Sequence, residues 1–209
     1  MNKRDSLFFF VVLLFSTHIL LFAQNNDHAD YLVLSTGDTL YGRVQHSKEG
    51  GFGGRGFHKK VRITDTNGKR KKYKRKNVSG FSVDGSVFES FWLTQQSQSF
   101  PRVSLENPRY DIVFKNGEQH FLRNVSKGRL NHYELEWFDQ ESSTLWSMSL
   151  LKKEGDRFFI RADQGLFGLK RKVLRNYFSD CPKLQEKIQR KELKKVHQVV
   201  TFYNTNCLP

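Results

Sequence analysis

The sequence predicts a mainly β protein of the α+β class: an antiparallel β-meander or partial barrel closed by a C-terminal helical pair. Three observations lead to this prediction. Strand-like segments recur between turn dipeptides, apolar residues near the C-terminus follow a helical spacing, and aromatic residues form 14% of the chain, enough for a sizeable core. The expected organisation is a signal peptide over 1–23, an antiparallel β-rich body over 24–178 and a helical segment over 179–209 packed on that body.

The N-terminal segment has the pattern of a secretory signal peptide. Two basic residues precede an apolar run over Leu7–Phe15, and Ala23 supplies a small residue for cleavage. A membrane anchor is the alternative, but it needs about 18 or more apolar residues, and the polar positions 16–18 interrupt this stretch. We therefore expect an exported protein, periplasmic or extracellular at the outer envelope, that begins near Gln24.

Turn signals divide the body into strands. A first hairpin is expected from Tyr31–Ser35 and Thr39–Gln45. Asn-Gly and Asp-Gly pairs favour turns that match the strand twist, and they predict three more hairpins: Val61–Thr66 with Lys69–Arg75, Gly80–Val83 with Ser86–Leu93, and Tyr110–Phe114 with Glu118–Leu122. Three later strands are expected at Tyr133–Phe138, Ser143–Leu151 and Arg157–Arg161. Whether the strands on either side of Thr94–Glu106 form one sheet or two stays open.

The tail changes to a helical period. Leu184 and Ile188 are four residues apart, and apolar residues recur again from Leu193 onwards, while Pro182 suits a first helical turn. The five-residue step between Ile188 and Leu193 breaks the phase. We therefore expect two helices, with a reversal of the chain between about Gln189 and Leu193.

Cys181 and Cys207 are the two cysteines of the chain, and export to an oxidising compartment favours their pairing. A reactive thiol pair would have a Cys-x-x-Cys spacing, which is absent. One straight helix from Pro182 to Asn204 would separate its ends by about 33 Å, whereas bridged cysteines need Cα atoms within about 7 Å. A structural disulfide therefore requires the same chain reversal.

Catalytic and metal-binding patterns are missing from the sequence. The seven histidines are scattered, with no His-x-His or His-Glu-x-x-His spacing, and no nucleophile motif is present. We interpret the dinucleotide-like spacing of Gly51–Gly56 as a loop, and the proximity of His28 to Asp30 as chance. We expect no catalytic residues, no metal site and no cofactor.

Aromatic residues of the strands can share a face. Phe81, Val83, Phe88 and Trp92 have a compatible alternation, as do Tyr133, Leu135 and Trp137. Burial in a core is the simpler interpretation, and a surface that stacks on sugar rings is the alternative.

Positive charge is concentrated in one stretch. Of a net charge of +14, the positions 43–76 contribute +11, from 13 basic and two acidic residues. The anion-binding residues we predict there are Lys69, Arg70, Lys71, Lys72, Lys74, Arg75 and Lys76. The alternative is a charged edge strand whose lysines prevent aggregation. A two-residue turn at Asn67-Gly68 would place Ile63 opposite Lys72 and Asp65 opposite Arg70.

Several short motifs carry a resemblance. They are Gly37-Asp38-Thr39, Lys72-Tyr73, Val78-Ser79-Gly80-Phe81, Phe88-Glu89-Ser90, Phe121-Leu122 before Gly128, the Tyr133 strand, Tyr177–Leu184 and Tyr203-Asn204. In these the chain resembles uncharacterised secreted β-rich proteins of Bacteroidetes-type bacteria. The resemblance covers most of the chain after the signal peptide, and it implies export and a β-rich body with a helical tail, without an activity.

These observations together predict an exported, non-catalytic envelope protein that acts as an interaction module for an anionic surface or partner. Anionic lipid, lipopolysaccharide and acidic glycan are the polyanions of that compartment, and export argues against nucleic acid. A structural or assembly component recognised through a β edge or the helical tail is the alternative, with a cryptic hydrolase third.

Overall fold

The computed structural model describes residues 30–46, 60–94, 109–114, 116–139, 142–165 and 167–207. The expected signal peptide, the segment Gly51–Gly56 and most of Thr94–Glu106 lie outside these residues. Strands dominate the described part, and helices follow at its C-terminal end. The predicted mainly β, α+β class is therefore confirmed.

The centre of the molecule is a closed six-stranded antiparallel barrel. Its strands are β7 (Ser86–Thr94), β8 (Arg109–Ile112), β9 (Glu118–Ser126), β10 (Leu130–Asp139), β11 (Thr144–Lys153) and β12 (Phe158–Arg161). The ring follows the order β7-β8-β12-β11-β10-β9, and pairing of β9 with β7 closes it. The strands on either side of Thr94–Glu106 thus belong to one sheet.

Three further strands extend this sheet beyond β7. They are β6 (Val78–Val83), β1 (Tyr31–Leu34) and β2 (Thr39–Tyr41), in the order β2-β1-β6-β7. The β6–β7 hairpin has the predicted two-residue turn, because Val83 pairs with Ser86 and both Asp84 and Gly85 have positive φ angles. That combination is the mirror-image turn that suits strand twist.

The hairpin predicted around Asn116-Gly117 is wrong. β8 and β9 do not pair with each other; each pairs with β7, so that Leu93 has both Ile112 and Glu118 as partners. Gly117 lacks the positive φ that an Asn-Gly hairpin turn needs. A Cβ atom there would lie 2.3 Å from the carbonyl oxygen of Leu93, so this glycine serves the close approach of two backbones.

A separate three-stranded sheet has the order β3-β4-β5, formed by β3 (Arg43–His46), β4 (Lys60–Thr64) and β5 (Arg70–Lys74). The predicted register of this hairpin is wrong by one residue, because Ile63 pairs with Lys71 and Thr64 with Arg70. The loop holds one residue more than expected: Asp65 pairs with Lys69 through its backbone N–H, and Gly68 takes a positive φ of 76°. A one-residue shift exchanges the faces of every side chain in β5.

Three apolar clusters hold these parts together. The first fills the barrel and includes Phe159 and Leu122. The second lies between the three-stranded sheet and the outside of the barrel, with Val61 and Ile63 against Phe81 and Phe121. The third packs the helices on the barrel. The inner face of the three-stranded sheet is therefore the side that packs on the rest of the protein.

The helical segment comprises α2 (Arg171–Tyr177), α3 (Pro182–Gln189) and α4 (Val196–Asn206). The predicted helical pair corresponds to α3 and α4, and the additional helix α2 places the start of the segment before the expected position 179. This helix has seven residues and buries one of them, Leu174, too short a stretch for a periodic signal.

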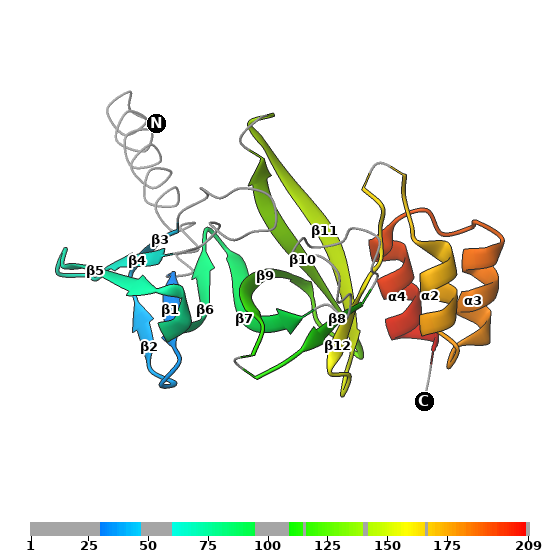
Figure 1. The fold of residues 1–209 in the computed structure, drawn as a ribbon, viewed down its shortest axis with the longest axis horizontal. Helices are drawn as coiled ribbons and strands as arrows, with labels where there is room; N and C mark the ends of the chain where they lie inside the picture. The colour runs from blue at the N-terminus through cyan, green and yellow to red at the C-terminus, as the bar shows by residue number, and fades with distance from the viewer. Residues whose placement is uncertain are drawn as a thin grey trace, which may run out of the picture.

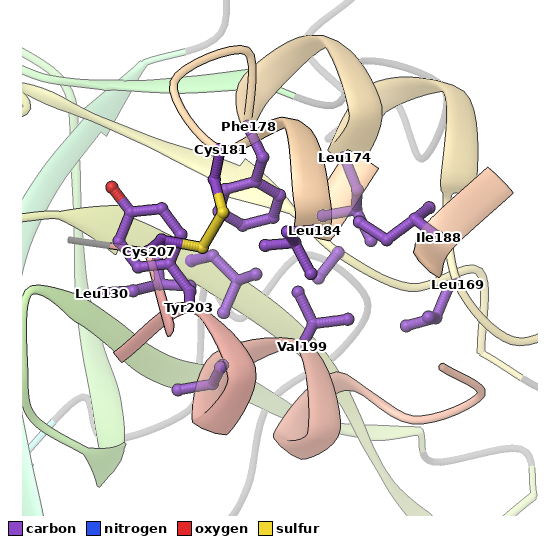
Figure 2. Close-up of a cluster of buried hydrophobic side chains, with 13 residues drawn as sticks. Leu130, Leu169, Leu174, Phe178, Cys181, Leu184, Ile188, Val199, Tyr203 and Cys207 are labelled. Carbon is purple, nitrogen blue, oxygen red and sulfur yellow. A yellow bond between two sulfur atoms is a disulfide. The ribbon is translucent and has the colours of Figure 1, made fainter. Parts of the chain in front are cut away.

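The disulfide prediction is confirmed, since Cys181 and Cys207 are bonded with their Cα atoms 5.5 Å apart. Figure 2 shows the bond beside Phe178 and Tyr203, at one edge of the buried cluster beneath the helices. The expected reversal also occurs: α3 ends at Gln189, and Lys191 takes a left-handed φ of 62° before α4 begins. The bridge thus joins the start of α3 to the end of α4.

The parts follow one another along the longest axis of the molecule (Figure 1). The three-stranded sheet lies near one end, the helices lie at the other, and the barrel occupies the middle. Among the described residues, no helix has the length and apolar character that a membrane crossing requires.

Candidate anion-binding surface

The outer face of the three-stranded sheet gathers exposed cations from all three strands. Side chains alternate between the faces of a strand, and directly opposed residues share a face. Val44, Val61 and Ile63 point inward to the buried cluster, so the alternate residues point outward. The outward set, which we call the basic face, is Arg43, Gln45, Lys60, Arg62, Thr64, Arg70, Lys72 and Lys74. Six of these eight residues are cationic and none is acidic.

Cations on the basic face oppose one another directly. Lys60 pairs with Lys74 and Arg62 with Lys72 across β4 and β5, an arrangement that destabilises a sheet. The pKa of Lys72 is lowered, first by the charge of Lys60, then by burial, and then by Arg62. Arg70 donates a hydrogen bond to the side-chain oxygen of Gln45 at 2.6 Å. Within the described ranges, no carboxylate forms an ion pair with any of the six cations.

The seven predicted site residues do not form a single patch. Arg70, Lys72 and Lys74 lie on the basic face, whereas Lys71 lies opposite Ile63 and belongs to the other face. Lys69 lies in the turn before β5, and Arg75 and Lys76 lie in the 3₁₀ turn η1 (Arg75–Asn77) that follows it. A continuous run of charge in the sequence is thus divided by strand geometry.

The predicted site residues do not include three cations of the basic face: Arg43, Lys60 and Arg62. A signal for the last two exists in the sequence, because Lys60-Val61-Arg62-Ile63 alternates charged and apolar residues, a pattern typical of a half-buried strand.

A hollow of about 620 Å³ adjoins the basic face where β5 ends. Its lining consists of Lys60, Lys74, Arg75, Lys76, Trp92, Gly117, Glu118 and Gln119. Gln119 on β9 connects the barrel to η1 on one side of the hollow. Its buried side-chain amide donates to the carbonyl oxygens of Arg75 at 3.1 Å and Val78 at 3.2 Å. The hollow is therefore built on the barrel and bounded by the basic stretch.

The electrostatics of the hollow are positive. Lys60, Lys74, Arg75 and Lys76 face one carboxylate of the lining, that of Glu118. Burial lowers the pKa of the half-buried Arg75 guanidinium, and the charge of Glu118 opposes this shift. Next to Gln119 in the chain, burial and then the charge of Arg75 lower the pKa of His120 to about 4. His120 is therefore neutral at pH 7, and the lining carries three more positive than negative charges.

Most of the residues predicted to share a face lie in one of two apolar clusters, and one of them lines the hollow. Phe81 and Phe88 are buried and stacked, with ring centroids 4.7 Å apart, and Val83 lies in the same cluster. Trp92 is half-buried and lines the hollow. Tyr133 and Leu135 are buried inside the barrel, and Trp137 packs against that cluster. Core packing thus accounts for every one of these residues except Trp92.

Elsewhere in the described chain, no group of three or more His, Cys, Asp or Glu side chains has an arrangement that could hold a metal ion. Comparisons of the chain with protein-family models, curated proteins and solved structures give no match. The function is therefore inferred from the geometry of the basic residues.

Proposed function

We propose that the protein is an exported, non-catalytic interaction module whose basic face docks on a phosphate-bearing lipid surface of the cell envelope, lipopolysaccharide or anionic phospholipid. The observation that carries the proposal is the basic face itself, with six exposed cations on three adjacent strands and no acidic residue among them.

The position of the cations favours binding over edge protection. Lysines that prevent aggregation belong on an edge strand, where backbone groups are unpaired. β5 is such an edge, but Lys60 and Arg62 lie on the central strand β4, which is paired on both sides. Cations there do nothing to shield an edge, and they add to the repulsion across the sheet.

This repulsion is itself an argument for function. Two directly opposed like-charged pairs weaken the sheet, and the lowered pKa of Lys72 reflects the same repulsion. Local rules of stability are broken most often at functional sites. A polyanion placed over the basic face would turn a mutual repulsion into a shared attraction.

The expected strength is sufficient for surface attachment. A Lys or Arg near an anionic membrane contributes about 1 kcal/mol, and the effect decays over a Debye length of about 8 Å at physiological salt. Neighbouring strands are about 4.8 Å apart, so a flat cationic sheet face brings its charges to the surface together. No shaped pocket is needed for this attachment.

Vesicle binding tests the proposal. We expect the protein to sediment with phosphatidylglycerol vesicles or lipopolysaccharide at low salt, to be released by raised salt, and to ignore phosphatidylcholine. The double variant Arg62→Glu/Lys72→Glu should lose this binding. The single variant Lys72→Glu should weaken it, and Lys71→Glu is its matched control, because it makes the same charge change one residue away on the opposite face. We expect Lys71→Glu to retain most of the binding.

Two outcomes would overturn the proposal. One is an absence of binding to any polyanion at low salt. The other is an equal loss of binding in the Lys71→Glu and Lys72→Glu single variants, because net charge alone would then govern the interaction and the basic face would have no special role.

A structural or assembly component is the second candidate, favoured by one observation. The β10–β11 hairpin projects from the barrel (Figure 1), and Leu145 and Trp146 on it are 47% and 39% exposed. A contiguous exposed apolar patch is typical of a contact site with another protein, and these two adjacent residues would form part of such a patch. In this case Leu145→Ser/Trp146→Ser would abolish a specific crosslink in intact cells and leave vesicle binding unchanged.

A further inference from the structure

The hollow beside the basic face has the features of a small-molecule site. Its volume of about 620 Å³ lies within the range of about 300 to 1,000 Å³ typical of ligand pockets. It combines an aromatic side chain, Trp92, with a few charged groups that converge on the same space. Its lining comes from β4, β5, η1, β7 and β9, so a folded arrangement of distant segments forms it.

The charged part of the lining suits a phosphate group. Lys74, Arg75 and Lys76 follow one another where β5 passes into η1, and Lys60 lies opposite Lys74 on the neighbouring strand. Arg75 is half-buried, which desolvates its guanidinium. A desolvated guanidinium presents a planar fork of donors that matches two phosphate oxygens.

The rest of the lining suits a sugar ring. Trp92 and Gln119 are directly opposed on β7 and β9 and therefore share the outer face of the barrel. An indole offers a flat apolar face on which the C–H face of a sugar can stack. Glu118 lines the hollow from the start of β9, where it is opposite Leu93 and one of its carboxylate oxygens lies 3.8 Å from Nε2 of His120. Carboxylate oxygens accept several hydrogen bonds, including those from hydroxyl groups.

The wall of the hollow is held in place before any ligand arrives. The side-chain nitrogen of Gln119 lies within hydrogen-bond distance of the carbonyl oxygens of Arg75 and Val78 and, at 2.6 Å, of the hydroxyl oxygen of Ser90, so its two N–H groups are shared among three acceptors. Gln119 is 4% exposed, and its amide N–H groups are already engaged, so it acts as a positioning residue. It fixes the backbone of η1 relative to Trp92, which reduces the ordering cost of binding.

We propose that this hollow binds a phosphorylated sugar, with the ring stacked on Trp92, the phosphate held by Lys74, Arg75 and Lys76, and the ring hydroxyls bonded to Glu118. The inference deepens the proposed function, because it names the headgroup class that a phosphate-bearing envelope surface would present. The same chemistry occurs in a free sugar phosphate and in a lipid-linked phosphosugar headgroup.

Titration with glucose 1-phosphate, followed by ¹H–¹⁵N NMR of the indole N–H signals, tests the site directly. The variant Trp92→Phe assigns the Trp92 signal among the three indoles of the chain. We expect the Trp92 signal to shift when glucose 1-phosphate is added, to shift far less with inorganic phosphate, and not to shift with glucose. Equal responses to glucose 1-phosphate and inorganic phosphate, or no response of Trp92, would overturn the proposal.

Two matched charge changes separate this site from the basic face. Lys76 lines the hollow and is not on the basic face, whereas Lys72 is on the basic face and does not line the hollow. Lys76→Gln should weaken glucose 1-phosphate binding about tenfold, the fold-change expected for one lost charged hydrogen bond, and leave vesicle binding nearly intact. Lys72→Gln should do the reverse, weakening vesicle binding and leaving glucose 1-phosphate binding nearly intact. Loss of sugar-phosphate binding in both variants, or in neither, would overturn the assignment of the hollow.

A competition experiment identifies the source of the sugar phosphate. Glucose 1-phosphate added to protein bound on lipopolysaccharide vesicles should displace a fraction of it if the hollow takes a lipid-linked headgroup. Lys76→Gln should then raise the concentration needed for displacement about tenfold. Undisturbed vesicle binding together with a shifted Trp92 signal would identify a free sugar phosphate. Failure of vesicle binding alone would overturn the proposed function and leave this site standing.

Discussion

The chain has two basic segments, and the structure treats their charges in opposite ways. The helical segment from Lys170 to Lys195 holds ten Lys and Arg residues, and two of them form ion pairs with carboxylates of the same segment. Lys187 pairs with Glu192 and Arg190 with Glu186, both at 2.6 Å. On the basic face, cations have other cations as neighbours. Charge count alone therefore does not define a binding surface; the pairing of the charges does.

The two regions also differ in how they are held. The helical segment has five fully buried apolar side chains, those of Leu174, Phe178, Leu184, Ile188 and Val199. The disulfide also links the start of α3 to the end of α4. The three-stranded sheet has a single covered face and an edge strand, β5. The helical end is thus held by a buried cluster and a crosslink. The three-stranded sheet instead has like charges opposed to one another on its open face.

Removal of the disulfide is the largest effect we expect, and it would destabilise the helical end of the molecule. On the chain-entropy model, a crosslink closing a loop of this length stabilises the fold by roughly 3 to 4 kcal/mol. Cys181→Ser/Cys207→Ser should therefore lower the free energy of unfolding in urea by about this amount. Vesicle binding by the protein that remains folded should be unchanged.

The reduced wild-type protein is the control for that variant, because it removes the bond and keeps the sulfur atoms. Similar losses in both would attribute the effect to the crosslink. A variant as stable as the oxidised protein would show that packing around Phe178 and Tyr203 alone holds the helices.

The difference between the two ends also explains what the sequence could reveal. The disulfide was predicted from the presence of two cysteines in a chain expected to be exported, and the chain reversal after Gln189 from the spacing of apolar residues. Both are present. Closure of the barrel could not be predicted, because it depends on β7 pairing with both β8 and β9. No dipeptide signals that arrangement, and the Asn116-Gly117 pair indicated a different one.

The sequence predicted the basic segment that carries the candidate site, but a register error prevented it from predicting which side chains share a face. Predicting the turn at Asn67-Gly68 as two residues long, instead of three, put Lys72 opposite Ile63, on the inner side of the sheet. The register error hid the alignment of Lys72 with Arg62. The hollow was beyond reach, since Trp92 and Arg75 are brought together only by the fold.

Acidification is the next largest effect and acts near the basic end. Burial and then the charge of Arg75 lower the pKa of His120 from an ordinary 6.5 to about 4 in the folded protein. The unfolded chain therefore takes up a proton first as the pH falls. The contribution of His120 to stability is complete above pH 6.5 and is lost between about 6.5 and 4, by at most about 3 kcal/mol.

His132 on β10 behaves in the same way, because burial lowers its pKa to about 4 as well. We therefore expect His120→Gln to remove about half of the pH dependence between pH 7 and pH 4.5. Urea unfolding of both proteins at the two pH values measures this. An unchanged pH dependence in the variant would mean that His120 is not held neutral by the fold.

The smallest effect is the most informative about the two basic regions, because one chemical change should have opposite signs in them. Lys72→Glu places a carboxylate opposite Arg62 and near Lys60, so it should raise the melting temperature at low salt by relieving repulsion. Lys187→Glu in α3 replaces the pairing with Glu192 by a repulsion, so it should lower the melting temperature. Lys72 is exposed and Lys187 is half-buried, and both shifts should shrink in about 0.5 M salt, where the Debye length falls to roughly 4 Å. Lys71→Glu, opposite Ile63 on the other face of β5, controls for net charge and should change the melting temperature less than Lys72→Glu. A fall in melting temperature for Lys72→Glu would mean that the cations of the basic face do not strain the sheet, and the argument from retained strain to anion binding would fail with it.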